Sequence, residues 1–192
     1  MLVGKFFKKI IQKNKNHYFS GLSFNSKKIK KKNIFFAIKG TNINGNKYIK
    51  EAIKKGATTV VSDLNFEGKK KGILYIKTNN SRKLLSEISS KYYYNKPSNL
   101  VAVTGTNGKS SVADFYSQIL KLNNKKVASI GTLGIKTYFN NLKINNTTLD
   151  PILLNKHLQK IKKYKIENVI LEASSHGIKQ HRLDGINFKI GI

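Results

Sequence analysis

A glycine-rich segment in the middle of the chain places a lysine and two hydroxyl side chains next to one another. It reads Thr104-Gly105-Thr106-Asn107-Gly108-Lys109-Ser110-Ser111. Glycines let backbone N–H groups converge on phosphate oxygens, and the N-terminus of a following helix adds partial positive charge. Lys109 is suited to reach terminal phosphates, and the Ser110 hydroxyl is suited to ligate Mg²⁺. The segment therefore predicts a loop that binds ATP and Mg²⁺, and a ligand-free turn with a chance Lys-Ser pair is the alternative.

Alternating strand and helix patterns surround this loop. Short apolar or β-branched runs predict strands, and apolar residues at three- and four-residue spacing predict helices. We predict strands over 34–38, 57–61, 73–76, 100–103, 127–130, 169–171 and 188–192, and helices over 46–55, 81–92, 112–120 and 151–163. In the helix after the loop, the predicted inner side consists of Val112, Phe115, Tyr116, Ile119 and Leu120. This alternation predicts an α/β fold whose parallel sheets are covered on both faces.

A polar segment at residues 95–99, which contains Pro97, is the best candidate for a linker. It divides the chain into a small N-terminal α/β domain, residues 1–97, and a parallel-sheet domain with the phosphate loop, residues 98–192. The chain stops inside its last predicted strand without a cap or a polar tail. We therefore expect the second domain to be truncated.

The composition excludes several classes of protein. Hydrophobic residues make up 39% of the 192 residues and aromatic residues 10%, which is enough for a core. No apolar run is long enough to span a membrane, and the N-terminus does not have the pattern of a secretory leader. Cysteine is absent, which excludes disulfides and thiolate metal sites. We expect a cytoplasmic protein without a membrane partner.

The net charge of +28 raises the possibility of a nucleic-acid partner. However, only Arg82 and Arg182 are arginines, and arginine is the residue that reads bases and grips phosphate bidentately. The lysines are spread along the chain instead of forming one patch. A basic nucleic-acid-binding protein is therefore an alternative supported by charge alone, and we predict no nucleic-acid partner.

Five segments resemble the Mur ligase superfamily, whose members form amide bonds with ATP. The loop 104–110, TGTNGKS, is similar to the phosphate loop of that family. The segment 171–182, LEASSHGIKQHR, resembles the MurE type within it. Similar stretches are SIGTLG at 129–134, NTTLDP at 146–151, and parts of residues 25–45. Folylpolyglutamate synthases share the loop but not the Ser-Ser-His-Gly segment, and the resemblance covers nearly all of the chain from about residue 20.

The resemblance implies an ATP-dependent ligase of peptidoglycan precursor synthesis. ATP would phosphorylate the D-glutamyl carboxylate of UDP-N-acetylmuramoyl-L-Ala-D-Glu. An amine of meso-diaminopimelate or L-lysine would then attack the acyl phosphate. We expect a monomer, although no residue of the sequence points to an oligomeric state. Three interpretations compete. The chain is an N-terminal fragment of such a ligase, a non-catalytic module that binds UDP-sugar and ATP, or the nucleic-acid binder.

The resemblance also implies roles for individual residues. Lys109 and Glu172 would be catalytic, and Ser110 and Glu172 would bind Mg²⁺. ATP would lie on Gly105, Thr106, Asn107, Gly108, Lys109, Ser110 and Ser111. The UDP-muramoyl dipeptide would contact Phe24, Ser26, Thr41, Asn42, Asn146, Thr147, Thr148, Ser174, Gln180 and Arg182. Glu172 follows an apolar run, and carboxylate oxygen suits Mg²⁺.

Simpler roles remain open for Glu172, Arg182 and His176. Glu172 has the alternative of a surface carboxylate, and Arg182 that of an ion pair with Asp184. We interpret His176 as a residue that orders its loop, because forming an acyl phosphate removes no proton from a carboxylate.

The chain departs from the family pattern at a few positions. Asn25 and Lys27 flank Ser26 where the family usually has an acidic residue and an arginine, so a point charge replaces a bidentate diphosphate grip. Val103 stands where the standard phosphate loop has a glycine, and Ser110 replaces the commoner threonine. We expect the serine to preserve the hydroxyl function and the change near Ser26 to weaken uridine binding.

Overall fold

The computed structural model describes residues 1–7, 12–40, 43–144 and 146–192. The chain divides into two compact units, Met1–Ile88 and Ser89–Ile192, and the division falls inside helix α2 (Ser81–Tyr92). The boundary that the sequence places between residues 97 and 98 stays a prediction. Among the described residues, none of the helices combines the length and apolar character needed to cross a membrane.

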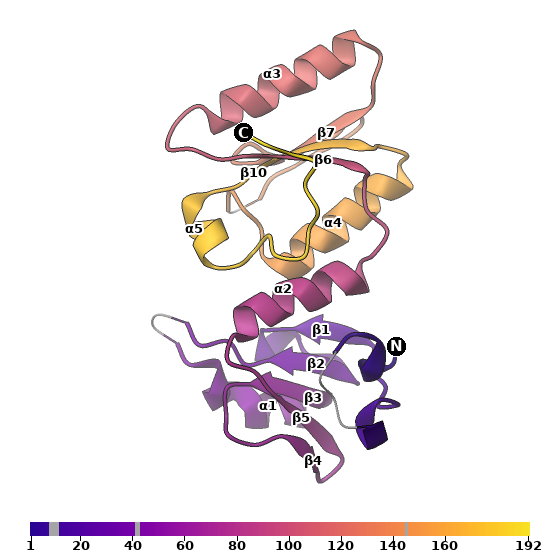
Figure 1. The fold of residues 1–192 in the computed structure, drawn as a ribbon, viewed down its shortest axis with the longest axis vertical. Helices are drawn as coiled ribbons and strands as arrows, with labels where there is room; N and C mark the ends of the chain where they lie inside the picture. Colours follow the sequence, from indigo (N-terminus) through magenta and orange to yellow (C-terminus); the bar gives the residue numbers. More distant parts are fainter. Residues whose placement is uncertain (8–11, 41–42, 145) are drawn as a thin grey trace. The chain divides into compact units, whose positions relative to one another are not determined.

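The first unit is built on a five-stranded sheet in the order β1-β2-β3-β5-β4 (Figure 1). Its strands are β1 (Gly21–Ser23), β2 (Asn33–Phe36), β3 (Ala57–Ser62), β4 (Gly68–Lys70) and β5 (Ile73–Lys77). All pairs are parallel except β4 with β5. Its helices are the 3-10 turns η1 (Val3–Lys5), η2 (Gln12–Asn14), η3 (Ser26–Lys28) and η4 (Gly45–Tyr48), followed by α1 (Ile49–Lys54) and the start of α2.

The sequence predicts β2, β3 and β5 correctly because each is an apolar or β-branched run. The predicted helix over 46–55 is divided into η4 and α1. Asn44 caps η4 by accepting a hydrogen bond from Asn46 N at 3.0 Å. Ile49 and Ala52 of α1 then pack against Phe35 and Val60 of the sheet.

The second unit contains a six-stranded sheet in the order β11-β6-β10-β7-β8-β9. Its strands are β6 (Asn99–Val103), β7 (Val127–Gly131), β8 (Gly134–Lys136), β9 (Asn141–Leu142), β10 (Asn168–Glu172) and β11 (Ile190–Gly191). The four strands β11, β6, β10 and β7 are parallel, whereas β8 and β9 are antiparallel to their neighbours. Its helices are α3 (Lys109–Leu122), α4 (Pro151–Lys163) and α5 (Ser175–Lys179).

Helices α3 and α4 cover opposite faces of this sheet (Figure 1). Val103 and Ile170 point to the α3 side, where they pack with Ala113. Val169 and Leu171, which neighbour Ile170 in β10, point to the α4 side instead. This alternation is the period of two expected for strands buried on both faces, and it confirms the predicted α/β architecture.

The inner face of α3 differs from the prediction at two residues. Phe115 is 61% exposed and Ile119 is 58% exposed, so their predicted inward placement is wrong. Ala113 and Ser117 are the buried residues of the helix. Their small side chains allow the helix backbone to approach the sheet, which rotates the larger side chains outward. Val112 and Tyr116 pack against the core as predicted.

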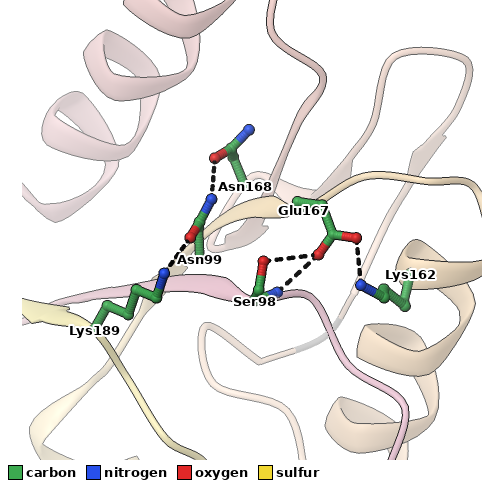
Figure 2. A network of polar contacts seen from close by, with 6 residues as sticks. All are labelled: Ser98, Asn99, Lys162, Glu167, Asn168 and Lys189. Atoms are coloured by element: carbon green, nitrogen blue, oxygen red, sulfur yellow. Dashed lines mark hydrogen bonds and ion pairs between the residues drawn. The ribbon is translucent and has the colours of Figure 1, made fainter.

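A polar network joins the amino ends of β6 and β10 to α4 (Figure 2). One carboxylate oxygen of Glu167 accepts hydrogen bonds from Ser98 N at 2.9 Å and Ser98 Oγ at 3.0 Å. The other oxygen forms an ion pair with Lys162 of α4. Asn99 Nδ2 donates to Asn168 Oδ1 at 2.9 Å, and Lys189 Nζ donates to Asn99 Oδ1 at 2.7 Å. The network lies at the end of the strands opposite to the phosphate loop.

Candidate functional site

The phosphate loop connects the carboxyl end of β6 to the amino end of α3. Gly105 has φ +139° and Gly108 has φ +82°, a region of backbone space that side chains with a Cβ rarely adopt. Gly108 is the N-cap of α3 and supplies no side-chain cap. The first N–H groups of the helix are therefore left without a capping side chain, as an anion-binding loop requires.

Lys109 folds back over the loop. Its Nζ atom donates hydrogen bonds to Gly105 O at 2.5 Å and to Thr106 O at 3.0 Å. The positive charge is thereby held directly at the turn where the sequence predicts phosphate oxygens. Residues 104–108 are exposed, so the loop is open to a ligand from solvent.

Glu172 is the last residue of β10, and its carboxylate is fixed in a buried position. The residue is only 3% exposed. Its Oε1 atom lies over the backbone of Gly131 in the neighbouring strand, so closely that a Cβ built on Gly131 would be 2.2 Å away. Its Oε2 atom accepts a hydrogen bond from Thr132 Oγ1 at 2.8 Å. The structure thus contradicts the alternative of a free surface carboxylate.

Glu172 and Ser110 line the same hollow, together with Asp114, Ser129 and Gly131. The hollow collects the hydroxyls of Ser110 and Ser129 and the carboxyls of Asp114 and Glu172 next to the phosphate loop, and Lys136 also lines it. These hard oxygen atoms suit Mg²⁺, which is usually held by one or two carboxylates together with substrate phosphates. The residues present therefore fit the metal that the sequence predicts, although no cluster of three or more His, Cys, Asp or Glu side chains occurs in the described parts of the chain.

Thr148 and Ser174 form a second group of hydroxyls beside Glu172. Thr148 Oγ1 donates to the backbone oxygen of Glu172 at 3.0 Å and lies 3.1 Å from Ser174 Oγ. Ser174 caps α5 by accepting from Gly177 N at 3.1 Å. Gly177 packs against Thr148, since a Cβ there would lie 2.8 Å from Thr148 Cβ. The two predicted substrate residues are thus brought together.

Arg182 lies on the same group. It donates to Thr148 O at 2.5 Å, and its Nη2 atom donates to Gln180 Oε1 at 2.8 Å. Gln180 Nε2 lies 2.7 Å from His176 Nε2. His176 therefore orients Gln180, which agrees with the interpretation that this histidine orders the loop. Asp184, the alternative partner of Arg182, has its Oδ2 atom 3.0 Å from His181 Nδ1.

The remaining predicted residues lie in different places. Thr147 is half-buried, and its Oγ1 atom is 3.0 Å from Thr132 Oγ1, whereas Asn146 is exposed on the same loop.

In the first unit, Ser26 is buried and its Oγ atom donates to Glu51 Oε2 at 2.9 Å. Phe24 is 40% exposed. The predicted contacts Thr41 and Asn42 lie outside the described residues.

The hydrogen bond from Ser26 also affects Glu51. Hydrogen bonds from Lys55 and then from Ser26 lower the pKa of the Glu51 carboxyl. Glu51 remains charged at neutral pH and holds the proton of Ser26. The Ser26 hydroxyl can therefore only accept a hydrogen bond from a ligand.

The polar or closely packed residues of the site that the sequence did not single out are Asp114, Ser129, Gly131, Thr132 and Lys136. Thr132 contacts Glu172 across 40 residues of chain. Parallel pairing of β10 with β7 sets Leu171 opposite Ile130 and so brings these residues together. The available sequence signal was the stretch 129–134, which resembles the family. That resemblance does not indicate which residue the Thr132 hydroxyl contacts.

Two family models match the chain. The Mur ligase family, catalytic domain, matches residues 18–93, and the Mur ligase middle domain matches residues 103–192. A ligase from Rickettsia montanensis named UDP-N-acetylmuramoyl-L-alanyl-D-glutamate--2,6-diaminopimelate ligase is 43% identical over 178 residues, which are 91% of this chain and 37% of that protein. A second ligase of that name, from Clostridium acetobutylicum, is 34% identical and covers 95% of this chain and 39% of that protein.

Solved structures agree with these sequence matches. A structure of UDP-N-acetylmuramoyl-L-alanyl-D-glutamate--2,6-diaminopimelate ligase superposes with a TM-score of 0.82 and 26% identity, covering 100% of this chain and 39% of that one. The MurF ligase from Thermotoga maritima in complex with ADP shares the fold, with a TM-score of 0.56 and 20% identity over 87% of this chain and 35% of that one.

The chain spans little more than a third of the length of these relatives. The two family models nevertheless match consecutive parts that together include most of its residues, and the phosphate loop and Glu172 lie in the second part. The chain belongs to the Mur ligase family, of which it carries the N-terminal and middle domain regions.

Proposed function

We propose that the chain supplies the sugar-nucleotide and ATP sites of a MurE-type ligase, which joins a diamino acid to UDP-N-acetylmuramoyl-L-Ala-D-Glu. The observation that carries this proposal is the convergence of Ser110 and Glu172 on one hollow beside the phosphate loop. The relatives' names support 2,6-diaminopimelate over L-lysine as the diamino acid. We further propose that the protein is a cytoplasmic monomer that acts in peptidoglycan precursor synthesis.

In the proposed reaction, a carboxylate oxygen of D-glutamate attacks the γ-phosphorus of ATP, and ADP leaves. The amine of the diamino acid then attacks the acyl carbon, phosphate leaves with the C–O bond pair, and the amine nitrogen releases a proton as the amide forms. Because two anions must meet in the first step, the site has to supply positive charge. Lys109 supplies one charge at the phosphates, and Mg²⁺, when bound by Ser110 and Glu172, neutralises phosphate oxygens.

The muramoyl-dipeptide end of the substrate is proposed to contact the three hydroxyls of Thr147, Thr148 and Ser174. Asn146, Gln180 and Arg182 are proposed to lie beside these hydroxyls. The hydrogen bonds of Arg182 to Thr148 and Gln180 support this assignment, because they fix a guanidinium next to the hydroxyls. The uridine diphosphate end is proposed to lie on Phe24, Ser26, Thr41 and Asn42.

The test is the affinity for ATP of the wild-type chain and of Lys109→Ala, measured by calorimetry with Mg²⁺. Hydrogen bonds to a charged group contribute about 1.5–3 kcal/mol, so we expect the dissociation constant of the variant to rise by about 10- to 150-fold. Lys121→Ala, in the last turn of the same helix, is the matched control and is expected to bind like wild type. Equal affinity for Lys109→Ala and wild type would overturn the assignment of the loop.

A further inference from the structure

A hydrogen-bonded chain of three side chains connects two sites that the proposed function keeps separate. Thr147, on the proposed substrate side, lies 3.0 Å from Thr132, and Thr132 lies 2.8 Å from Glu172, on the proposed metal side. Thr132 itself belongs to neither group and connects them.

The chemistry of the three groups fixes the direction of the protons. An ionised carboxylate only accepts hydrogen bonds, so Thr132 donates its single hydroxyl proton to Glu172 Oε2. Thr132 has no second proton to give, and Thr147 must therefore donate to Thr132. The lone pairs of Thr147 Oγ1 remain to accept a hydrogen bond from a ligand.

The contact between Thr132 and Glu172 is important because the Glu172 carboxylate lies in a confined position. Glu172 is buried, and its Oε1 atom occupies the space beside Gly131 that a Cβ on that residue would fill. Thr132 holds the opposite oxygen. The hydrogen bond from Thr132, in the turn that follows β7, therefore holds the carboxylate in the space that Gly131 leaves open.

We propose that Thr132 is a positioning residue that couples substrate binding at Thr147 to metal binding at Glu172. A substrate hydroxyl or amide N–H that donates to Thr147 strengthens the donation from Thr147 to Thr132 and then from Thr132 to Glu172, because hydrogen bonds in a chain polarise one another. The result is a carboxylate held more firmly for Mg²⁺ when the sugar nucleotide is bound. This inference rests on the proposed function.

The experiment measures coupling between the two ligands. The affinity of the chain for UDP-N-acetylmuramoyl-L-Ala-D-Glu is determined by calorimetry with saturating ADP, once with Mg²⁺ and once with EDTA. For wild type we expect Mg²⁺ to raise the affinity at least about fivefold, the lower end of typical coupling between sites. We expect this factor to fall to about one in Thr132→Val and to be restored in Thr132→Ser, because the serine keeps the hydroxyl.

Two further variants make the result specific. Thr137→Val removes a hydroxyl that caps the β8–β9 turn by donating to Asn140 O at 2.9 Å, and it is expected to keep the wild-type coupling. Thr132→Ala is measured beside Thr132→Val, because valine adds a methyl group next to a buried carboxylate. Thermal unfolding of each variant establishes that it is folded.

The outcomes separate the two proposals. If wild type binds neither ADP nor the sugar nucleotide, the proposed function is wrong and the coupling falls with it. If wild type binds both ligands but shows no coupling, or if Thr132→Val and Thr132→Ala keep the wild-type factor, the role of Thr132 is overturned while the proposed function stands.

Discussion

The carboxylate of Glu172 has room only because residue 131 is glycine. In Gly131→Ala the new Cβ would be 2.2 Å from Oε1, and the carboxylate would have to leave its position. Overpacking of this kind costs about 1–3 kcal/mol, so we expect a loss of that size in the free energy of unfolding, measured in urea, together with weaker binding of Mg²⁺ in the presence of ADP.

The matched control for this variant is Gly191→Ala in β11. A Cβ at that position meets no atom within 4 Å, so we expect a change of less than about 0.5 kcal/mol. Equal stability of the two variants would mean that the carboxylate can move aside without cost, and the fixed position of Glu172 would then be wrong.

At the residue scale, the sequence indicates the candidate residues of a site more readily than the side chains that hydrogen-bond to them. Lys109 and Ser110 can be identified as candidates from the sequence because the phosphate loop is one uninterrupted segment with a recognisable spacing. Thr132 holds Glu172 through the register of two strands that lie far apart in the chain, and no local pattern encodes that register.

Among the helices, α4 has the most clearly defined start. Asp150 Oδ1 accepts hydrogen bonds from Ile152 N and Leu153 N, both at 3.0 Å, and Pro151 occupies the first helical position. We expect Asp150→Ala to lower the free energy of unfolding by about 0.5–2 kcal/mol, the usual effect of losing an N-cap. Asp150→Asn keeps an accepting oxygen and should retain most of the stability; if both variants unfold alike in urea, the capping contribution is refuted.

The network in Figure 2 makes the joint between β6, β10 and α4 sensitive to acid. The hydrogen bond from Lys162, followed by that from Ser98, lowers the pKa of the Glu167 carboxyl below its ordinary value. A carboxyl whose pKa is lower in the folded state stabilises the fold above the unfolded pKa and loses that contribution as the pH falls through the folded pKa. Because Glu167 is partly exposed, we expect less than about 1 kcal/mol.

The measurement is urea unfolding of wild type and Glu167→Gln at about pH 7 and about pH 3, on either side of the carboxyl titration. The stability difference between the two proteins should be present at the higher pH and shrink at the lower one. A difference of constant size at both pH values would show that the charge of Glu167 does not contribute. Glu87→Gln, on α2 of the other unit, serves as the control for loss of one carboxylate.

At the element scale, the sequence predicts the buried parallel strands and misses the polar ones. The strands β4 and β9 have mostly exposed residues, and β1 and β8 are only three residues long. Such strands exist because a neighbouring strand pairs with them, and their own side chains carry little period-two signal. The outward rotation of Phe115 has a similar cause, since the small residues that face the sheet decide the orientation of α3.

The net charge of +28 belongs to the molecule as a whole and calls for a test of its own. Binding to a nucleic-acid backbone releases counterions, so the affinity for a DNA duplex, measured by fluorescence anisotropy, should fall by about a thousandfold or more between about 50 and 200 mM salt. Recognition of a sugar nucleotide by hydroxyls and amides should change by less than about tenfold over the same range. DNA binding that falls steeply with salt in this way, without any sugar-nucleotide binding, would favour a nucleic-acid function.

The strand order of the second sheet also affects how the protein is made. Both neighbours of β6, the strand that leads into the phosphate loop, lie later in the chain, since the strands that pair with β6 in the described residues are β10 and β11. Asn99 meets its partner Asn168 across 69 residues, which a ribosome translates in about 3–14 seconds. During that time a nascent chain presents an apolar strand with two unpaired edges, so co-translational chaperones have a defined window in which to bind it.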